Sequence, residues 1–117
     1  MRYILSFLLS FFITTLTFSQ DKTFRIGFLL DKNSVEINEL LKELSDEISA
    51  IVGEDAVLEF PEVSKLVNNF DSSTALNNYN VLVENNTDII IAFGVVNNAV
   101  ISKIGTYQKP TIVFGAL

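Results

Sequence analysis

The 117-residue sequence contains no cysteine and no histidine. Without these residues the chain has no thiol nucleophile, no imidazole base and no zinc site of the usual kind. Phosphate-binding glycine patterns are missing too, because the apolar run Phe24–Leu30 is followed by Asp-Lys-Asn-Ser, which matches neither a dinucleotide-binding motif nor a P-loop. No G-x-S-x-G nucleophile motif occurs. These absences argue against an enzyme, and no cofactor is expected.

Positive charge is also scarce. Eight Lys and Arg residues stand against fourteen Asp and Glu residues, a formal net charge of −6. Binding to a nucleic acid needs a basic footprint, so nucleic acid is excluded as a partner. The adjacent acids Asp46-Glu47 and Glu54-Asp55 fall on the polar face and at the end of a predicted helix, where we interpret them as solvated charges.

The first 19 residues are typical of a secretory signal peptide. Met1–Arg2 supplies a positive charge, Tyr3–Phe18 is mainly apolar, and Thr17-Phe18-Ser19 has small residues at the −3 and −1 positions of a cleavage site. The alternative is a membrane anchor, but the apolar run is interrupted by three threonines and is shorter than the about 20 residues that span a bilayer. We therefore predict a signal peptide over residues 1–19, a mature domain over residues 20–117, and a periplasmic location.

Four apolar runs in the mature part have the length of strands: Phe24–Leu30, Ala56–Phe60, Asp88–Phe93 and Thr111–Phe114. Their alternation with helical patterns predicts an α/β fold, a doubly wound, Rossmann-like parallel sheet of about four strands.

Three helices are expected between these strands. The first has an apolar stripe from Ile37 to Ile51 and ends at Gly53, with Asn33 or Ser34 as its cap. The second is capped by Ser72 or Ser73 and runs to about Asn85, and the third runs from Val96 to Ile104. Between Pro61 and Asp71 we expect a loop over Glu62–Lys65, and Leu66–Phe70 is either extended or in a short turn.

The carboxyl ends of parallel strands meet at one edge of the sheet, where α/β proteins bind ligands. The candidate ligand-binding residues follow the first, third and fourth strands: Asp31, Asn33, Ser34, Gly94, Val95, Val96, Asn97, Gly115 and Ala116. Free N–H groups at helix starts suit a carboxylate or phosphate, and Gly94 lets a ligand approach the backbone closely. Two alternatives stay open: Asp31 is a cap, or an acceptor or magnesium ligand of the receiver type, and Gly94 is a tight-turn residue.

The segments FRIGFLLD, TDIIIAFGVVNN and PTIVFGAL resemble the first lobe of type I periplasmic substrate-binding proteins of ABC transporters, most closely the branch related to aromatic amino-acid binders. The resemblance implies a small ligand held in a cleft between two lobes and delivered to a membrane permease. Family members often carry a small or hydroxyl residue near the position of Val95-Val96, and this chain departs from that pattern.

From this resemblance we expect a periplasmic solute-binding lobe, incomplete as a two-lobe fold because the second lobe is missing from this chain. Its partners would be the small-molecule ligand and the permease. The alternative is an N-terminal accessory or sensor domain of a larger envelope transport protein, such as an outer-membrane efflux channel. Neither interpretation requires catalysis.

Overall fold

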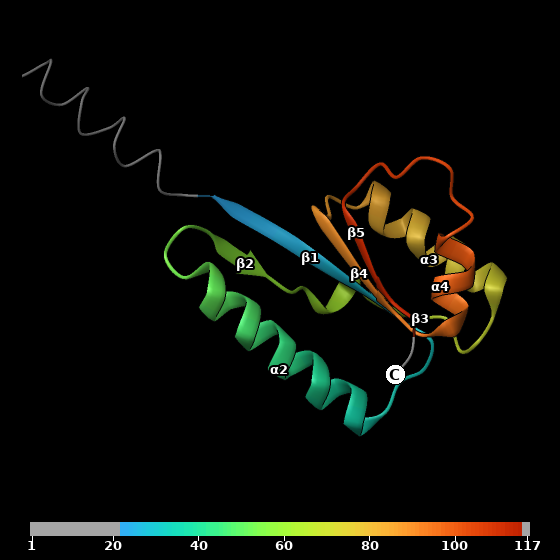
Figure 1. Cartoon of the computed structure of the whole chain (residues 1–117), viewed down its shortest axis with the longest axis horizontal. Coiled ribbons are helices and arrows are strands. Elements are labelled where there is room, and N and C mark those ends of the chain that lie inside the picture. The colour runs from blue at the N-terminus through green and yellow to red at the C-terminus, as the bar shows by residue number, and fades with distance from the viewer. Residues whose placement is uncertain (1–21, 116–117) are drawn as a thin grey trace, which may run out of the picture.

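The described residues, 22–115 of a computed structural model, form a parallel β-sheet with helices on both faces (Figure 1). The predicted signal peptide and Ala116 lie outside these residues. The strands are β1 (Thr23–Leu30), β2 (Val57–Glu59), β3 (Lys65–Val67), β4 (Ile89–Phe93) and β5 (Thr111–Phe114). The helices are α2 (Val35–Val52), α3 (Ser72–Glu84) and α4 (Val95–Ile101), with a single 3₁₀ turn, η1 (Glu62–Ser64), between β2 and β3.

The sheet has five strands in four positions. Its main path runs β2–β1–β4–β5, and β3 also pairs with β1. Because β2 pairs with the start of β1 (from Thr23) and β3 with its end (to Leu30), the two short strands act as one interrupted strand. The chain moves from β1 to β2 on one side and then returns to β4 on the other. The strand order therefore reverses between β1 and β4, which is the position where doubly wound sheets bind ligands.

Side chains alternate across β1 and build one apolar core on each face of the sheet. Phe28 and Leu30 of β1 pack with Ile37 and Leu41 of α2 on one face. On the other face, Leu29 packs with residues of α3 and α4, including Tyr79, Leu82 and Ile101. The doubly wound α/β prediction is thus confirmed.

Three details differ from the prediction. The predicted loop Glu62–Lys65 instead forms η1 and the start of β3, while Leu66 and Val67 are extended, one of the two expected alternatives. The cap of α3 is Asp71, whose carboxylate accepts hydrogen bonds from Thr74, and neither predicted serine caps it. Helix α4 ends at Ile101, and Ile104, which was expected inside the helix, reaches the apolar core from the turn that follows it. Within residues 22–115, no helix has the combined length and apolarity that crossing a membrane requires.

Candidate functional site

The candidate site lies where β1 and β4 end side by side. Asp31 follows β1 directly and Gly94 follows β4 directly. Two of the predicted strand exits are therefore neighbours at the point where the strand order reverses, and the third, after β5, is next to β4.

The carboxylate of Asp31 is buried and caps helix α4. Its Oδ2 accepts a hydrogen bond from the backbone N–H of Val96 at 2.9 Å, and its Oδ1 accepts one from the N–H of Asn97 at 3.1 Å. These N–H groups belong to the first turn of α4, which has no intrahelical partner for them. The expectation of a free α4 N-terminus for a ligand's carboxylate or phosphate is therefore wrong, because a carboxylate of the chain itself occupies it.

Gly94 is required by this arrangement for two reasons. Its φ of +106° is in the region that side chains other than glycine rarely adopt. In addition, a Cβ at this position would collide with the carboxylate of Asp31. The turn alternative explains Gly94 without any ligand, since the glycine allows Asp31 to reach the helix.

Two buried asparagines complete the polar centre. The Nδ2 of Asn68 donates to Asp31 Oδ1 at 2.9 Å and to Asn97 Oδ1 at 3.1 Å. The Nδ2 of Asn97 donates to the carbonyl oxygen of Phe93 at 3.0 Å. Asn97 is one of the predicted site residues, whereas no sequence pattern singles out Asn68 among the many asparagines. The network is satisfied internally, so these side chains hold the loops and the helix together.

The loop after Asn68 presents an aromatic ring at the edge of the site. Asn69 and Phe70 have φ values of +54° and +63°. The backbone N–H of Phe70 donates to the carbonyl oxygen of Asp31 at 3.1 Å and to Asn68 Oδ1 at 2.7 Å. Left-handed backbone is tolerated by asparagine but is uncommon for a bulky residue. These two hydrogen bonds hold Phe70 in that conformation, with its side chain 59% exposed.

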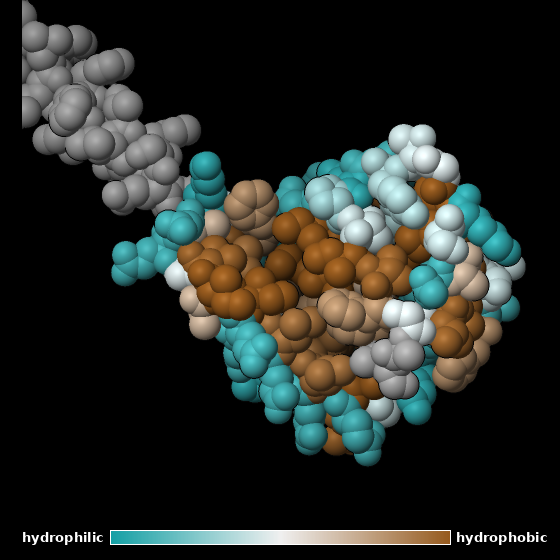
Figure 2. All heavy atoms as spheres, in the orientation of Figure 1, coloured by the Kyte–Doolittle hydropathy of each residue, from teal (hydrophilic) through white to brown (hydrophobic). Residues whose placement is uncertain are grey.

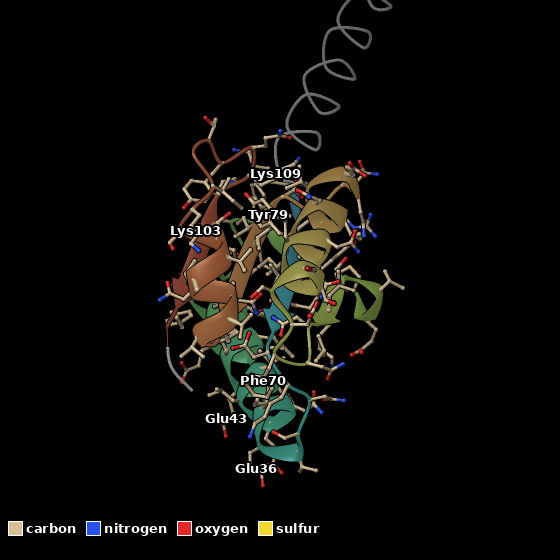
Figure 3. All side chains as sticks on the ribbon, turned by 90° about the vertical axis from the view of Figure 1, so that its right-hand side faces the viewer. Glu36, Glu43, Phe70, Tyr79, Lys103 and Lys109 are labelled. Carbon is tan, nitrogen blue, oxygen red and sulfur yellow. The ribbon has the colours of Figure 1, made fainter. Side chains whose placement is uncertain are left out.

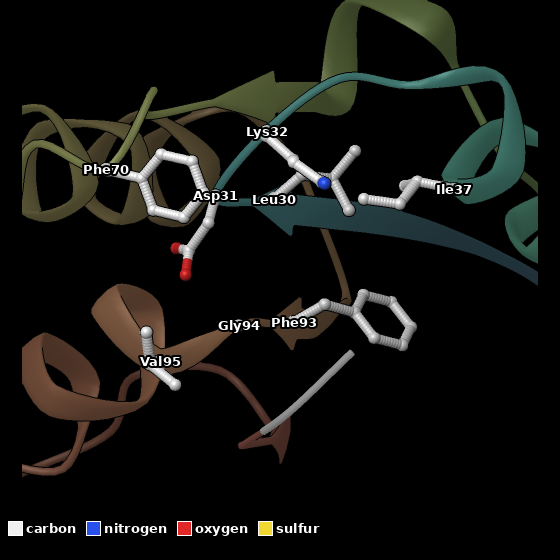
Figure 4. A pocket seen from close by; sticks show the side chains of 8 residues that line it. All are labelled: Leu30, Asp31, Lys32, Ile37, Phe70, Phe93, Gly94 and Val95. Atoms are coloured by element: carbon white, nitrogen blue, oxygen red, sulfur yellow. The ribbon is translucent and has the colours of Figure 1, made fainter.

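A cavity of about 190 Å³ lies beside this polar centre. In Figure 4, Phe70 and Val95 are on one side of the cavity, and Ile37 and Phe93 are on the other. Asp31 and Gly94 form its base, and Lys32 is the cation at its rim. Phe70 was not among the predicted site residues, because its segment has no clear sequence pattern, and neither was Phe93, which ends the apolar run of β4. Phe93 is buried in the core, and it also lines the cavity.

The other predicted site residues have local roles. The Ser34 hydroxyl caps α2 by accepting from the N–H of Ile37 at 3.2 Å. Asn33 Oδ1 accepts from Asn38 Nδ2 at 3.0 Å. Gly115 lies close to the Asn98 side chain of α4, where an added Cβ would approach Nδ2 to 3.2 Å. None of these three residues lines the cavity.

The arrangement suits non-covalent binding better than catalysis. Among residues 22–115, Asp31 is the only carboxylate that lines the cavity, and both of its oxygens already accept hydrogen bonds. Because these hydrogen bonds use both carboxylate oxygens, the structure does not support the alternative in which Asp31 is an acceptor or magnesium ligand of the receiver type. In the described part of the chain, acidic side chains do not gather in a group of three that could hold a metal ion.

The chain was compared with protein-family models, with curated proteins and with solved structures, and none of them matches it.

Proposed function

We propose that this domain captures a small ligand at the β1–β4 edge, as one lobe of a periplasmic solute-binding protein of an ABC-type transport system. The observation that carries the proposal is the cavity at the reversal of strand order, walled by apolar side chains and bordered by one cation. Binding sites of α/β sheets lie at this position. The expected export of the chain and its resemblance to type I binding proteins support a role in solute capture.

The size of the cavity favours a shared site. Ligand pockets usually measure about 300–1,000 Å³, and this cavity measures about 190 Å³. It therefore accommodates the apolar part of a ligand, while the rest of the ligand stays outside. A second lobe that closes over the exposed part would complete the site.

The lining residues indicate the class of ligand. Leu30, Ile37, Phe70, Phe93 and Val95 offer apolar contacts. Lys32 makes no ion pair within residues 22–115 and offers its ammonium group to an anion at the rim. We infer a small compound with an apolar body and a carboxylate, such as an apolar amino acid or a short-chain carboxylic acid.

The test is a screen of amino acids, carboxylic acids, sugars and inorganic anions by protein-observed NMR. Apolar carboxylates are expected to shift the amide resonances of Lys32, Phe70 and Val95, and sugars are expected to leave them unchanged. If no compound shifts these resonances in a folded sample, the proposal fails.

A Phe70→Gly variant separates binding from folding. Glycine removes the exposed ring but accepts a φ of +63°, so the variant is expected to gain up to about 1 kcal/mol of stability. Affinity for the apolar ligand is expected to fall at least tenfold, because the ring is a wall of the cavity. The matched control is Val63→Ala in η1, an exposed apolar residue outside the cavity, which should change neither property. Unchanged affinity in Phe70→Gly would place the ligand elsewhere.

A further inference from the structure

The two faces of the sheet are covered unequally. Helices α3 and α4 lie on one face, and α2 lies alone on the other (Figure 1). Helices α3 and α4 pack against each other and together cover one face, so a sheet with these four strand positions accommodates two helices on a face. Each face therefore has room for two helices. On the α2 face, the described chain supplies only one.

The side chains of β5 show where that face is open. Val113 packs into the core on the α3 and α4 side, so its neighbours Ile112 and Phe114 project to the α2 side. Ile112 is 50% exposed and Phe114 is 43% exposed. The ring of Phe114 stacks on Phe93 with centroids 5.0 Å apart, which extends the apolar core to the edge strand. This edge of the core faces solvent.

Helix α2 contributes a second apolar border. A cavity beside β2 and β3 is lined by Asn38, Lys42 and Ser45, which identifies the flank of α2 that faces these strands. On a period of 3.6 residues, the opposite flank carries Leu40, Leu44 and Ile51 and therefore faces β4 and β5. We call the exposed apolar residues of this surface the open face: Phe24, Leu40, Ile51, Ile112 and Phe114. Figure 2 shows a continuous apolar area between α2 and β5.

The charge beside the open face has one sign. On the same helical period, Glu36 and Glu47 lie beside Leu40 and Ile51 on the α2 surface, on the side nearer to solvent. No Lys or Arg lies on that flank of α2. The single basic residue of α2, Lys42, is on the other flank and pairs with Asp46 at 3.3 Å. Figure 3 shows Glu36 and Glu43 at one end of the molecule and Lys103 and Lys109 toward the other. An occupant that lies beside α2 therefore meets negative charge.

We propose that the open face docks an amphipathic α-helix of a partner protein, with an apolar stripe against β4 and β5 and Lys or Arg residues along the flank next to α2. A helix fits because the faces of parallel sheets are covered by helices, and the described chain places two helices on one face of this sheet and only α2 on the other. Recognition would follow the helix-in-groove mode, in which apolar anchors bind and charges select the partner. This docking does not depend on the proposed ligand capture and would persist if the cavity bound nothing.

The probe is a synthetic helical peptide of about 14 residues with blocked ends, Leu on one face and Lys on both flanks. Its binding to the chain is measured by fluorescence anisotropy. We expect saturable binding that weakens at least tenfold in Leu40→Asn and in Ile112→Asn. Leu76→Asn is the matched control, because Leu76 is also an exposed leucine on a helix but lies on α3, and this variant should bind normally. Both test positions are exposed, so neither substitution removes a buried core residue.

Charge selection is tested with a second peptide in which every Lys is Glu. It should bind at least tenfold more weakly to the unmodified chain, and a Glu36→Lys, Glu47→Lys double variant should reduce or reverse that preference. The proposal is overturned if the folded chain binds neither peptide, if both bind equally, or if Leu40→Asn and Leu76→Asn weaken binding equally. Self-association that Ile112→Asn abolishes would also overturn it, because the occupant would then be a second copy of the chain.

Discussion

Helices α2 and α4 begin at the same edge of the sheet, but their first turns are capped in different ways. The cap of α2 is local: Ser34 accepts from the N–H of Ile37, three residues later. At the start of α4, Gly94 has no side chain to offer, and the acceptor is Asp31, 65 and 66 residues before the N–H groups of Val96 and Asn97. The start of α2 is thus determined by neighbouring residues, whereas the start of α4 depends on the pairing of β1 with β4.

Ser34 and Asp31 both follow β1, but the two residues have different structural roles. Ser34 stabilises one helix. Asp31 links β1, the loop at Asn68 and helix α4, so its loss affects three segments. A buried polar network in which every member has a partner fixes one arrangement of its elements, and a missing member leaves buried donors unpaired. The hydrogen bonds from Asp31 to α4 and to Asn68 therefore hold the base of the cavity in place.

The largest expected effect is that of Asp31→Ala. The substitution removes the acceptor of the N–H groups of Val96 and Asn97 and one of the two acceptors of Asn68 Nδ2, and we expect a loss of about 3–5 kcal/mol of unfolding free energy. The melting temperature should fall by roughly 15 °C or more. Ser34→Ala removes a single local cap and is expected to cost about 1 kcal/mol. Urea unfolding of the three proteins measures the difference.

Equal costs for Asp31→Ala and Ser34→Ala would contradict the contrast between a local and a distant cap. Amide hydrogen exchange provides an independent readout. Asp31→Ala should accelerate exchange in α4 and in the loop at Asn68, while Ser34→Ala should accelerate it only in the first turn of α2.

Gly94→Ala is expected to cost somewhat less, about 2–4 kcal/mol, because the backbone conformation is strained for alanine and the new methyl group displaces the Asp31 carboxylate. Part of this cost requires Asp31 to be present. In the double variant with Asp31→Ala, the combined loss should therefore be smaller than the sum by at least about 0.5 kcal/mol. Additive losses would show that the glycine serves only its own turn.

The same contrast explains what the sequence could predict. The short apolar run Phe24–Leu30 and the apolar stripe of α2, which repeats about every 3.6 residues, are local patterns, and the structure confirms both elements. The sequence also predicted that Asp31 and the residues around Gly94 lie at one edge of the sheet, since both follow parallel strands. The structure adds that these two strands are neighbours. The fold class and the edge at which the candidate site lies therefore follow from local sequence patterns and the topology that they imply.

The roles inside the site were harder to predict, because they depend on side chains that are distant in the chain. Nothing near Asp31 indicates that its carboxylate turns toward α4 rather than toward a ligand. Asn68 and Phe70 lie in a segment without periodicity, and their conformation is set by hydrogen bonds to Asp31 and by the left-handed backbone between them. These contacts exist only once the sheet has formed.

The smallest expected effect concerns α3, which has a local cap like α2 but a titratable one. The side chain of Asp71 accepts hydrogen bonds from the hydroxyl and the backbone N–H of Thr74, both at 2.7 Å, and these bonds lower the pKa of its exposed carboxyl below the ordinary value. A lowered pKa in the folded state means that the cap stabilises the protein above the ordinary pKa of aspartate and loses this contribution as the pH falls through the lowered value. Carbon-detected NMR titration of Asp71 should show the shift, and Thr74→Ala should move the pKa back toward the ordinary value, because the hydroxyl bond is its largest cause. If the pKa of Asp71 is at the ordinary value, or if Thr74→Ala does not change it, the cap of α3 is too weakly formed to be compared with the cap of α2.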